Sequence, residues 1–210
     1  MSSDTNPAGL LANLQRFTRR KEGADSCELC GAEIGAKHRH LLRMTDRRVV
    51  CGCDACAILF ESGARFRTVP CDVRLCEDFA MTDLEWNALA IPVRLAFVCH
   101  EGYCCNPTIR YPSPVGATEA GVDARSWTEI VARNPVLRLL RPHVESLLIN
   151  RIGEPYEHYL VPIDECYRLT GIIRTEWRGF SGGAEVWQSI RAFLASLRER
   201  ATRARRLEHA

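Results

Sequence analysis

The sequence lacks the features of several common protein classes. No stretch of its 210 residues approaches the roughly 18 consecutive apolar residues that a membrane-spanning helix needs. The pair Arg19-Arg20 is followed by polar residues, so it predicts neither a twin-arginine nor an ordinary secretory signal. A formal net charge of +2 is too small to indicate nucleic acid or a membrane surface as the partner. We therefore expect a cytoplasmic protein without a membrane span.

Familiar catalytic motifs are also missing. The Gly-x-Ser-x-Gly elbow of hydrolases is absent, and Ser181-Gly182-Gly183 lacks the lysine and the spacing of a phosphate-binding loop. Cys166 makes no recognisable nucleophile pair with a histidine, and Asp164 and Glu165 are sequence neighbours whose side chains would point apart. We therefore expect a protein that is not an enzyme.

Cysteine, in contrast, is abundant, with 11 residues. Their odd number in a chain without a secretory signal points to metal ligands and buried thiols more than to disulfides. Two Cys-x-x-Cys pairs, Cys27/Cys30 and Cys53/Cys56, are separated by 22 residues, close to the usual four-cysteine zinc spacing. Gly31 can take the positive φ that a tight, ion-binding turn requires. We predict that the four thiolates bind one Zn²⁺, with iron as the alternative.

The residues around the two pairs predict the element order of a treble-clef module. The second pair runs into residues 55–60 without a turn residue, so a helix is expected to begin there, where its N-terminal N–H groups favour thiolates. Between the pairs, residues 38–44 and 47–50 predict a β-hairpin with its turn near Asp46. Knuckle, hairpin and ligand-bearing helix then follow one another.

Three further residues could take part in metal binding. Cys51 could replace Cys53, join a cluster, or be a strand thiol beside the site, and we favour the last interpretation. His38 and His40 fall on one face of the expected strand, where one of them could complete the metal sphere. The alternative is that both histidines lie on the surface or only contact the metal ligands without binding the ion. The expected helix offers no histidine or asparagine for a catalytic ion, so an HNH nuclease is not expected.

The remainder of the chain predicts an α+β domain with a mainly antiparallel sheet and a long C-terminal amphipathic helix. Capping residues and apolar periodicity predict helices that begin at Thr82, Ser126, Asp164 and Ser181, besides a short helix over residues 10–17. Apolar runs predict strands at residues 66–69, 93–98, 108–111, 144–152 and 159–161. Gly171, inside a helical pattern, suggests that another backbone packs closely against it. Tyr111–Glu119, with its two prolines, is expected to be a restricted loop.

Four segments are expected from these patterns. Residues 1–22 would be a tail with the short helix, 23–65 the metal module, 66–202 the α+β domain and 203–210 a basic tail. Cys71 and Cys76 could form a further metal pair, but no matching pair accompanies them, so free thiols are expected. Cys104-Cys105 are poor joint ligands for one ion because adjacent side chains diverge.

Six motifs together give the chain a resemblance. They are Cys-Glu-Leu-Cys-Gly, His-Arg-His-Leu, Cys-x-Cys-x-x-Cys, Tyr-Pro-Ser-Pro-x-Gly-Ala-Thr-Glu, Val-Pro-Ile-Asp-Glu-Cys-Tyr-Arg-Leu and Trp-Arg-Gly-Phe-Ser-Gly-Gly. From about Cys27 to about Arg200 the chain resembles an uncharacterised bacterial domain family commonly encoded beside actinobacterial-type, high-affinity NiFe hydrogenase genes. The resemblance implies an accessory role in hydrogenase maturation, assembly or electron delivery, with a hydrogenase subunit or a maturation factor as the protein partner.

Three functions remain open at this point. The first is a zinc-stabilised accessory protein that acts through protein contacts. The second is an electron carrier of rubredoxin type, in which the same four thiolates hold iron. The third is a regulator that binds nucleic acid through the metal module and the basic ends of the chain, which would show steep salt dependence.

Overall fold

The computed structural model describes residues 25–61, 63–100, 107–120 and 124–204. The expected helix at residues 10–17 and the pair Cys104-Cys105 lie outside the described residues. The helices are α2 (Asp54–Phe60), α3 (Asp83–Ala88), α4 (Ala124–Arg133), α5 (Ile163–Glu176) and α6 (Gly183–Arg200), with the 3₁₀ helix η1 (Pro135–Leu139). The strands are β1 (Asp25–Ser26), β2 (Glu33–Ile34), β3 (Arg39–Arg43), β4 (Arg48–Gly52), β5 (Phe66–Thr68), β6 (Arg74–Leu75), β7 (Leu95–Cys99), β8 (Thr108–Ser113), β9 (Gly116–Glu119), β10 (Glu145–Asn150), β11 (Glu157–Pro162) and β12 (Thr202–Arg203).

The N-terminal part of the described chain is a small module built around one hairpin. Strands β3 and β4 pair antiparallel across a turn at Asp46, which confirms the predicted hairpin. Strand β5 pairs with the other edge of β3, so residues 66–68 belong to the sheet of the module. Helix α2 packs on this sheet over a small core of Leu41, Val50, Ala57 and Phe66. A separate two-stranded pair, β1 and β2, holds the first cysteine pair.

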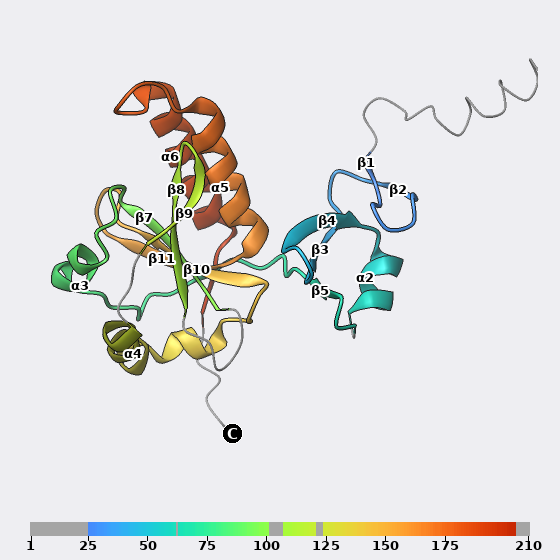
Figure 1. Ribbon diagram of the computed structural model, residues 1–210, viewed down its shortest axis with the longest axis horizontal. Helices are drawn as coiled ribbons and strands as arrows, with labels where there is room; N and C mark the ends of the chain where they lie inside the picture. Colours follow the sequence, from blue (N-terminus) through green and yellow to red (C-terminus); the bar gives the residue numbers. More distant parts are fainter. Residues whose placement is uncertain (1–24, 62, 101–106, 121–123, 205–210) are drawn as a thin grey trace, which may run out of the picture.

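A seven-stranded sheet forms the larger part of the molecule. Its order is β12-β6-β11-β10-β7-β8-β9, and every pairing is antiparallel except that of β12 with β6. Helices α5 and α6 lie on one face of this sheet, and α3 and α4 lie on the other (Figure 1). Every residue of the central strand β10 is buried. Side chains alternate between the faces of a strand, so Leu147 and Ile149 pack toward α3 and α4 while Leu148 packs toward α5 and α6.

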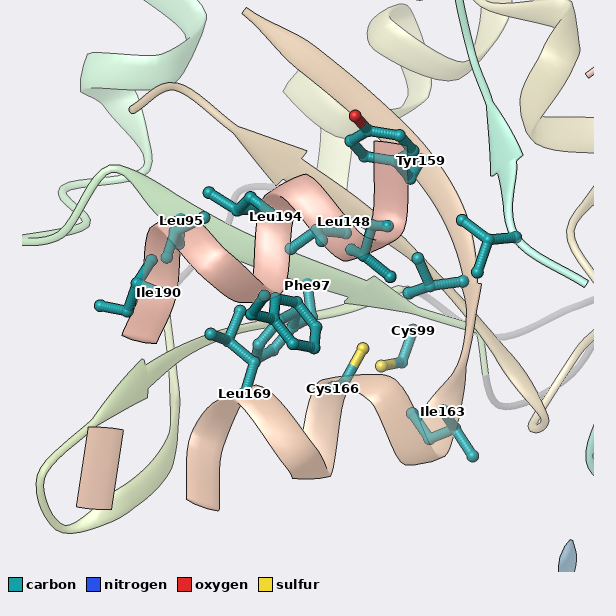
Figure 2. Close-up of a cluster of buried hydrophobic side chains, with 14 of the residues drawn as sticks. Leu95, Phe97, Cys99, Leu148, Tyr159, Ile163, Cys166, Leu169, Ile190 and Leu194 are labelled. Carbon is teal, nitrogen blue, oxygen red and sulfur yellow. The ribbon is translucent and has the colours of Figure 1, made fainter. Parts of the chain in front are cut away.

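The core under α5 and α6 follows the predicted helical stripes. Figure 2 shows Leu169, Ile190 and Leu194 of the two helices pointing toward Phe97 and Leu148 of the sheet. All five residues of the stripe predicted for the last helix are buried: Val186, Ile190, Phe193, Leu194 and Leu197. The prediction of close backbone packing at Gly171 is wrong, because a Cβ at this position would meet nothing within 4 Å.

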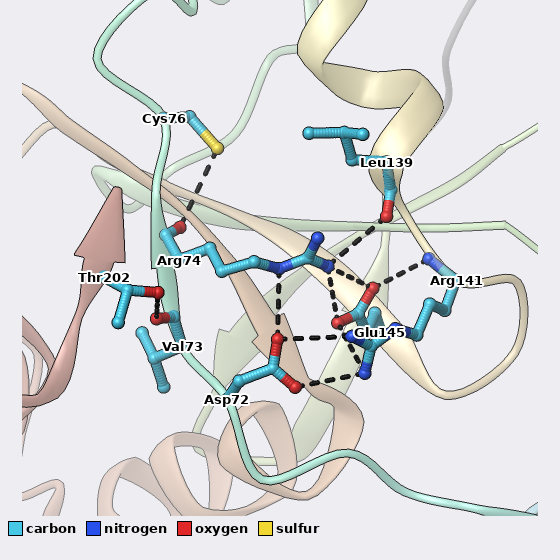
Figure 3. A network of polar contacts seen from close by, with 8 residues as sticks. All are labelled: Asp72, Val73, Arg74, Cys76, Leu139, Arg141, Glu145 and Thr202. Atoms are coloured by element: carbon cyan, nitrogen blue, oxygen red, sulfur yellow. Dashed lines mark hydrogen bonds and ion pairs between the residues drawn. The ribbon is translucent and has the colours of Figure 1, made fainter. Parts of the chain in front are cut away.

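The module and the large sheet share part of one hydrophobic core. Leu42 of β3 and Val69, which follows β5, are both fully buried in the cluster beneath α5 and α6. A polar network next to this junction links β6 to β10 (Figure 3). In it, the guanidinium of Arg74 lies between Asp72 and the fully buried carboxylate of Glu145, and Arg141 approaches both acids from the other side. The network fixes the segment by which the chain enters the large sheet.

The expectation of a loop at Tyr111–Glu119 is wrong, because this segment forms the β8–β9 hairpin. Pro112 has no N–H and cannot donate a ladder hydrogen bond to a neighbouring strand. It is accommodated because the pairing of β8 with β7 ends at Arg110, two residues earlier. The hydroxyl of Ser113 donates to the carbonyl of Gly116 at 2.8 Å, and Gly116 has a φ of 123° that favours glycine.

Three helices begin at other residues than predicted. Helix α4 starts two residues before Ser126, so the expected capping box lies inside it. Helix α5 has Pro162 as its N-cap, and Asp164 lies in its first turn. Helix α6 starts after Gly182, which has a φ of 86°, and no side chain of Ser181 caps it. A chain reversal with left-handed backbone replaces the expected side-chain cap. The box at Thr82 is confirmed at the start of α3.

Candidate metal centre

Two cysteine pairs from different elements meet in the N-terminal module. The sulfur atoms of Cys27, Cys30, Cys53 and Cys56 all lie within 4.8 Å of one another, and those of Cys30 and Cys53 are 3.7 Å apart. A tetrahedral zinc site with Zn–S bonds of about 2.3 Å has sulfurs about 3.8 Å apart. The cluster could therefore hold a metal ion such as zinc or iron with little rearrangement.

The first pair is positioned by a tight turn between β1 and β2. The N–H of Gly31 donates to the carbonyl of Cys27 at 2.8 Å, and the N–H of Cys27 donates to the carbonyl of Ala32 at 2.8 Å. Gly31 has a φ of 76°, which confirms the positive φ expected there. The turn brings both thiols to the same side.

The second pair is positioned by the start of a helix, as predicted. Cys53 is the N-cap of α2, and its sulfur accepts a hydrogen bond from the N–H of Cys56 at 3.4 Å. Gly52 precedes it at the end of β4, where a Cβ would come within 2.3 Å of the Leu41 side chain. A side chain at this position would displace the buried side chain of Leu41, so glycine suits the close approach of β4 to β3.

The cluster places thiols where their charges interact. Burial raises the pKa of the Cys27 thiol, but backbone hydrogen bonds from Cys53, Leu29 and Cys30 outweigh burial and lower this pKa to about 6. Burial, together with the neighbouring sulfurs, raises the pKa of Cys56 to about 12. The protein alone thus favours one thiolate and opposes the accumulation of several. A bound cation would supply the positive charge that ionisation of the remaining thiols requires.

His38, His40 and Cys51 form a group of their own, separate from the four-cysteine cluster. One ligand atom of each lies within 4.8 Å of the others. His40 also bonds Asp164 of α5, with 2.6 Å between Nδ1 and Oδ2. This hydrogen bond raises the pKa of His40. Asp164 could not be predicted as the partner of His40, because the two residues are 124 positions apart and no local pattern marks such a contact.

The other candidate residues are distributed over the molecule. Cys71 is exposed, and burial raises the pKa of Cys76 to about 12. The β8–β9 hairpin contributes Ala117 and Glu119 to a cavity of about 410 Å³, opposite Cys166 on α5. No helix in the described ranges has the length and apolarity that a membrane crossing requires.

The fold and this cluster define a mixed α+β protein with a four-cysteine cluster near its N-terminus that could hold a metal ion. The chain belongs to the family of unknown function DUF5947, whose model matches residues 26–201. This match includes both cysteine pairs, the histidine group and the large sheet, and it confirms an uncharacterised domain family. No curated protein matches the chain. No solved structure matches it either.

Proposed function

We propose that this chain is a zinc-stabilised accessory protein that acts through protein contacts and not through catalysis. The observation that carries the proposal is the donor set of Cys27, Cys30, Cys53 and Cys56, whose sulfurs lie within 4.8 Å of one another. Four thiolates fill every position of a tetrahedral ion and leave none for substrate or water, which is typical of structural zinc.

The proposed zinc would hold together a unit whose own core is small. The cluster beneath α2 has four buried side chains, and the knuckle between β1 and β2 adds Ile34 next to Cys27 and Cys56. Units of this size need a metal or another covalent link for stability. Structural zinc supplies on the order of 10 kcal/mol of folding free energy to such modules. We describe the knuckle, hairpin and helix as treble-clef-like on this basis.

The surface of the module supports a role in protein contacts. Ile58 and Leu59 of α2, two and three residues after Cys56, are both 73% exposed. Two adjacent large apolar side chains in water favour burial by a partner. We take the partner from the sequence resemblance: a subunit or a maturation factor of a NiFe hydrogenase, met in the cytoplasm.

An iron-based electron carrier is the second candidate, because backbone N–H groups surround the Cys27 sulfur, as they do in iron–thiolate sites. The two candidates differ in colour, since iron–thiolate proteins absorb visible light and zinc proteins do not. A colourless protein with bound zinc would exclude this alternative.

The contact surface is tested by affinity capture of hydrogenase components with the full chain at native expression levels. The double variant Ile58→Ser/Leu59→Ser should lose the captured component while keeping its metal. Val115→Ser is the matched control, because Val115 is 88% exposed at the tip of the β8–β9 hairpin and far from α2 in sequence. The proposal is wrong if no hydrogenase component is captured, or if the double variant and the control capture it equally well.

A further inference from the structure

Three metal-binding side chains lie together on the β3–β4 hairpin, outside the four-cysteine cluster. His40 on β3 is directly opposite Cys51 on β4, so both side chains project from the same face of the hairpin. His38 is two residues before His40 and falls on that face as well. The two imidazole rings are 5.0 Å apart, edge to face. A strand pairing, and not a chance approach of loops, therefore brings the three groups together.

A hydrogen bond from the ring of His38 favours the tautomer that can bind a metal ion through Nε2. Its Nδ1 is 2.8 Å from the carbonyl oxygen of Gly35. A carbonyl only accepts, so Nδ1 carries the hydrogen and Nε2 carries the lone pair. That Nε2 is buried and has no hydrogen-bond partner. A buried acceptor without a partner is destabilising, and a bound cation would remove this cost.

The ring of His40 is oriented in the same way, by a hydrogen bond to Asp164 of α5. Its Nδ1 lies 2.6 Å from Oδ2 of Asp164. In the neutral ring this nitrogen donates to the carboxylate, and Nε2 is then the atom available to an ion. Carboxylate–histidine–metal arrangements fix the tautomer and orientation of ligating histidines in this manner. Asp164 itself is held in the first turn of α5, where its Oδ1 accepts from the N–H of Glu165 at 2.9 Å.

We propose that His38, His40 and Cys51 are a second metal site, which binds an exchangeable divalent transition-metal ion through two nitrogens and one sulfur. Their ligand atoms are within 4.8 Å of one another. Bound ions of the zinc type require separations of about 3.3–3.8 Å, so the three groups need to approach one another only slightly on binding. Imidazole and thiolate ligands select zinc, cobalt or nickel over calcium and magnesium.

This site differs from the four-cysteine cluster because its protein ligands leave one coordination position of the ion unfilled. Three protein ligands leave the fourth coordination position of a tetrahedral ion to water or a small exogenous ligand. A cavity of about 140 Å³ reaches the group, lined by both histidines together with Cys71, Asp164 and Arg200. Because the ligands come from the module and Asp164 comes from α5, the ion also reinforces the contact between the two. This goes beyond the structural role proposed for the first cluster.

The experiment is a titration of the full-length, metal-free, reduced chain with Co²⁺, followed by visible spectroscopy and elemental analysis. Wild type should bind two ions per chain, the first with the intense bands of four-thiolate cobalt and the second with a weaker, distinct spectrum. His38→Ala and Cys51→Ser should each lose the second ion and keep the first. The four-thiolate bands report directly that the module is folded in each variant.

Two further variants sharpen the result. Cys71→Ser removes an exposed thiol that lines the same cavity but lies outside the ligand group, so it should still bind two ions. Asp164 is a positioning residue, and Asp164→Asn keeps the shape of its side chain. The variant should lower the affinity for the second ion by about 10–100-fold without changing the affinity for the first. The proposal is overturned if wild type binds one ion, or if the second ion survives His38→Ala and Cys51→Ser. Absence of the four-thiolate cobalt bands in wild type would instead count against the proposed structural zinc.

Discussion

Replacing Arg74 by methionine should destabilise the fold strongly, because it isolates a buried charge. The Glu145 side chain is 0% exposed, and both of its oxygens lie 2.7 Å from Nη2 of Arg74. Its other partners are the N–H of Arg141 at 2.7 Å and the Arg141 guanidinium at 3.7 Å. Arg141 is half-exposed and also pairs with Asp72, so it compensates only in part.

The expected magnitude follows from this partner list. Removal of one member of a buried ion pair costs about 3–5 kcal/mol. Because Arg141 still contacts Glu145, we expect Arg74→Met to lower the free energy of unfolding by about 3 kcal/mol. The double variant Arg74→Met/Glu145→Leu removes both charges and should lose much less than the sum of the two single variants. The exposed pair Arg203–Glu77 is the control, and Arg203→Ala should cost less than about 1 kcal/mol.

The assay is urea unfolding of the zinc-loaded chain, followed by circular dichroism and by tryptophan fluorescence. Coincident transitions are needed before free energies of unfolding are compared. A loss below about 1 kcal/mol for Arg74→Met would refute the reasoning, because it would mean that Glu145 is solvated or neutral without Arg74. The reasoning would also be refuted if the double variant lost as much stability as the two single variants together, because the two side chains would then not interact.

The remaining predictions concern a histidine, two glycines and a ligand. Burial lowers the pKa of His158 to about 4, whereas the pKa of this histidine in the unfolded chain is near 6.5, so the unfolded chain binds the proton first as pH falls. Up to about 3 kcal/mol of stability should therefore be lost between pH 6.5 and pH 4. Urea unfolding of the variant His158→Gln should not show this loss. Gly182→Ala should lower Tm, because a Cβ there would lie 2.9 Å from a Val186 methyl at a φ of 86°, whereas Gly171→Ala should raise it slightly. Cys56→Ser should lose the tightly bound metal by elemental analysis, and Tm should then no longer respond to a chelator.

The metal module was the most predictable part of the molecule, because its signals are local. The spacing of the cysteine pairs, Gly31 after the first pair and the apolar run after the second are all read within a few residues, and the structure has the turn and the helix where they were expected. The hairpin around Asp46 follows from the same short-range pattern. The predicted boundaries between the four segments remain predictions.

The parts that could not be predicted depend on contacts between distant residues. The bond between His40 and Asp164 joins positions 124 apart, and local patterns favoured a helix cap for the aspartate. Pro112 is tolerated in β8 because the pairing of β8 with β7 has already ended at Arg110, which depends on the register of the two strands. The open space beside Gly171 likewise depends on how α5 packs, and no propensity encodes it.

The most direct test of the central claim is the metal content of the full-length protein after purification under reducing, anaerobic conditions without added metal. After dialysis against a weak chelator, we expect one retained zinc per chain, no visible absorbance, and loss of this zinc in Cys56→Ser but not in Cys71→Ser. Iron with thiolate charge-transfer bands would contradict the account and favour electron transfer. A wild-type chain that retains no metal yet unfolds at the same temperature with and without zinc would contradict it as well.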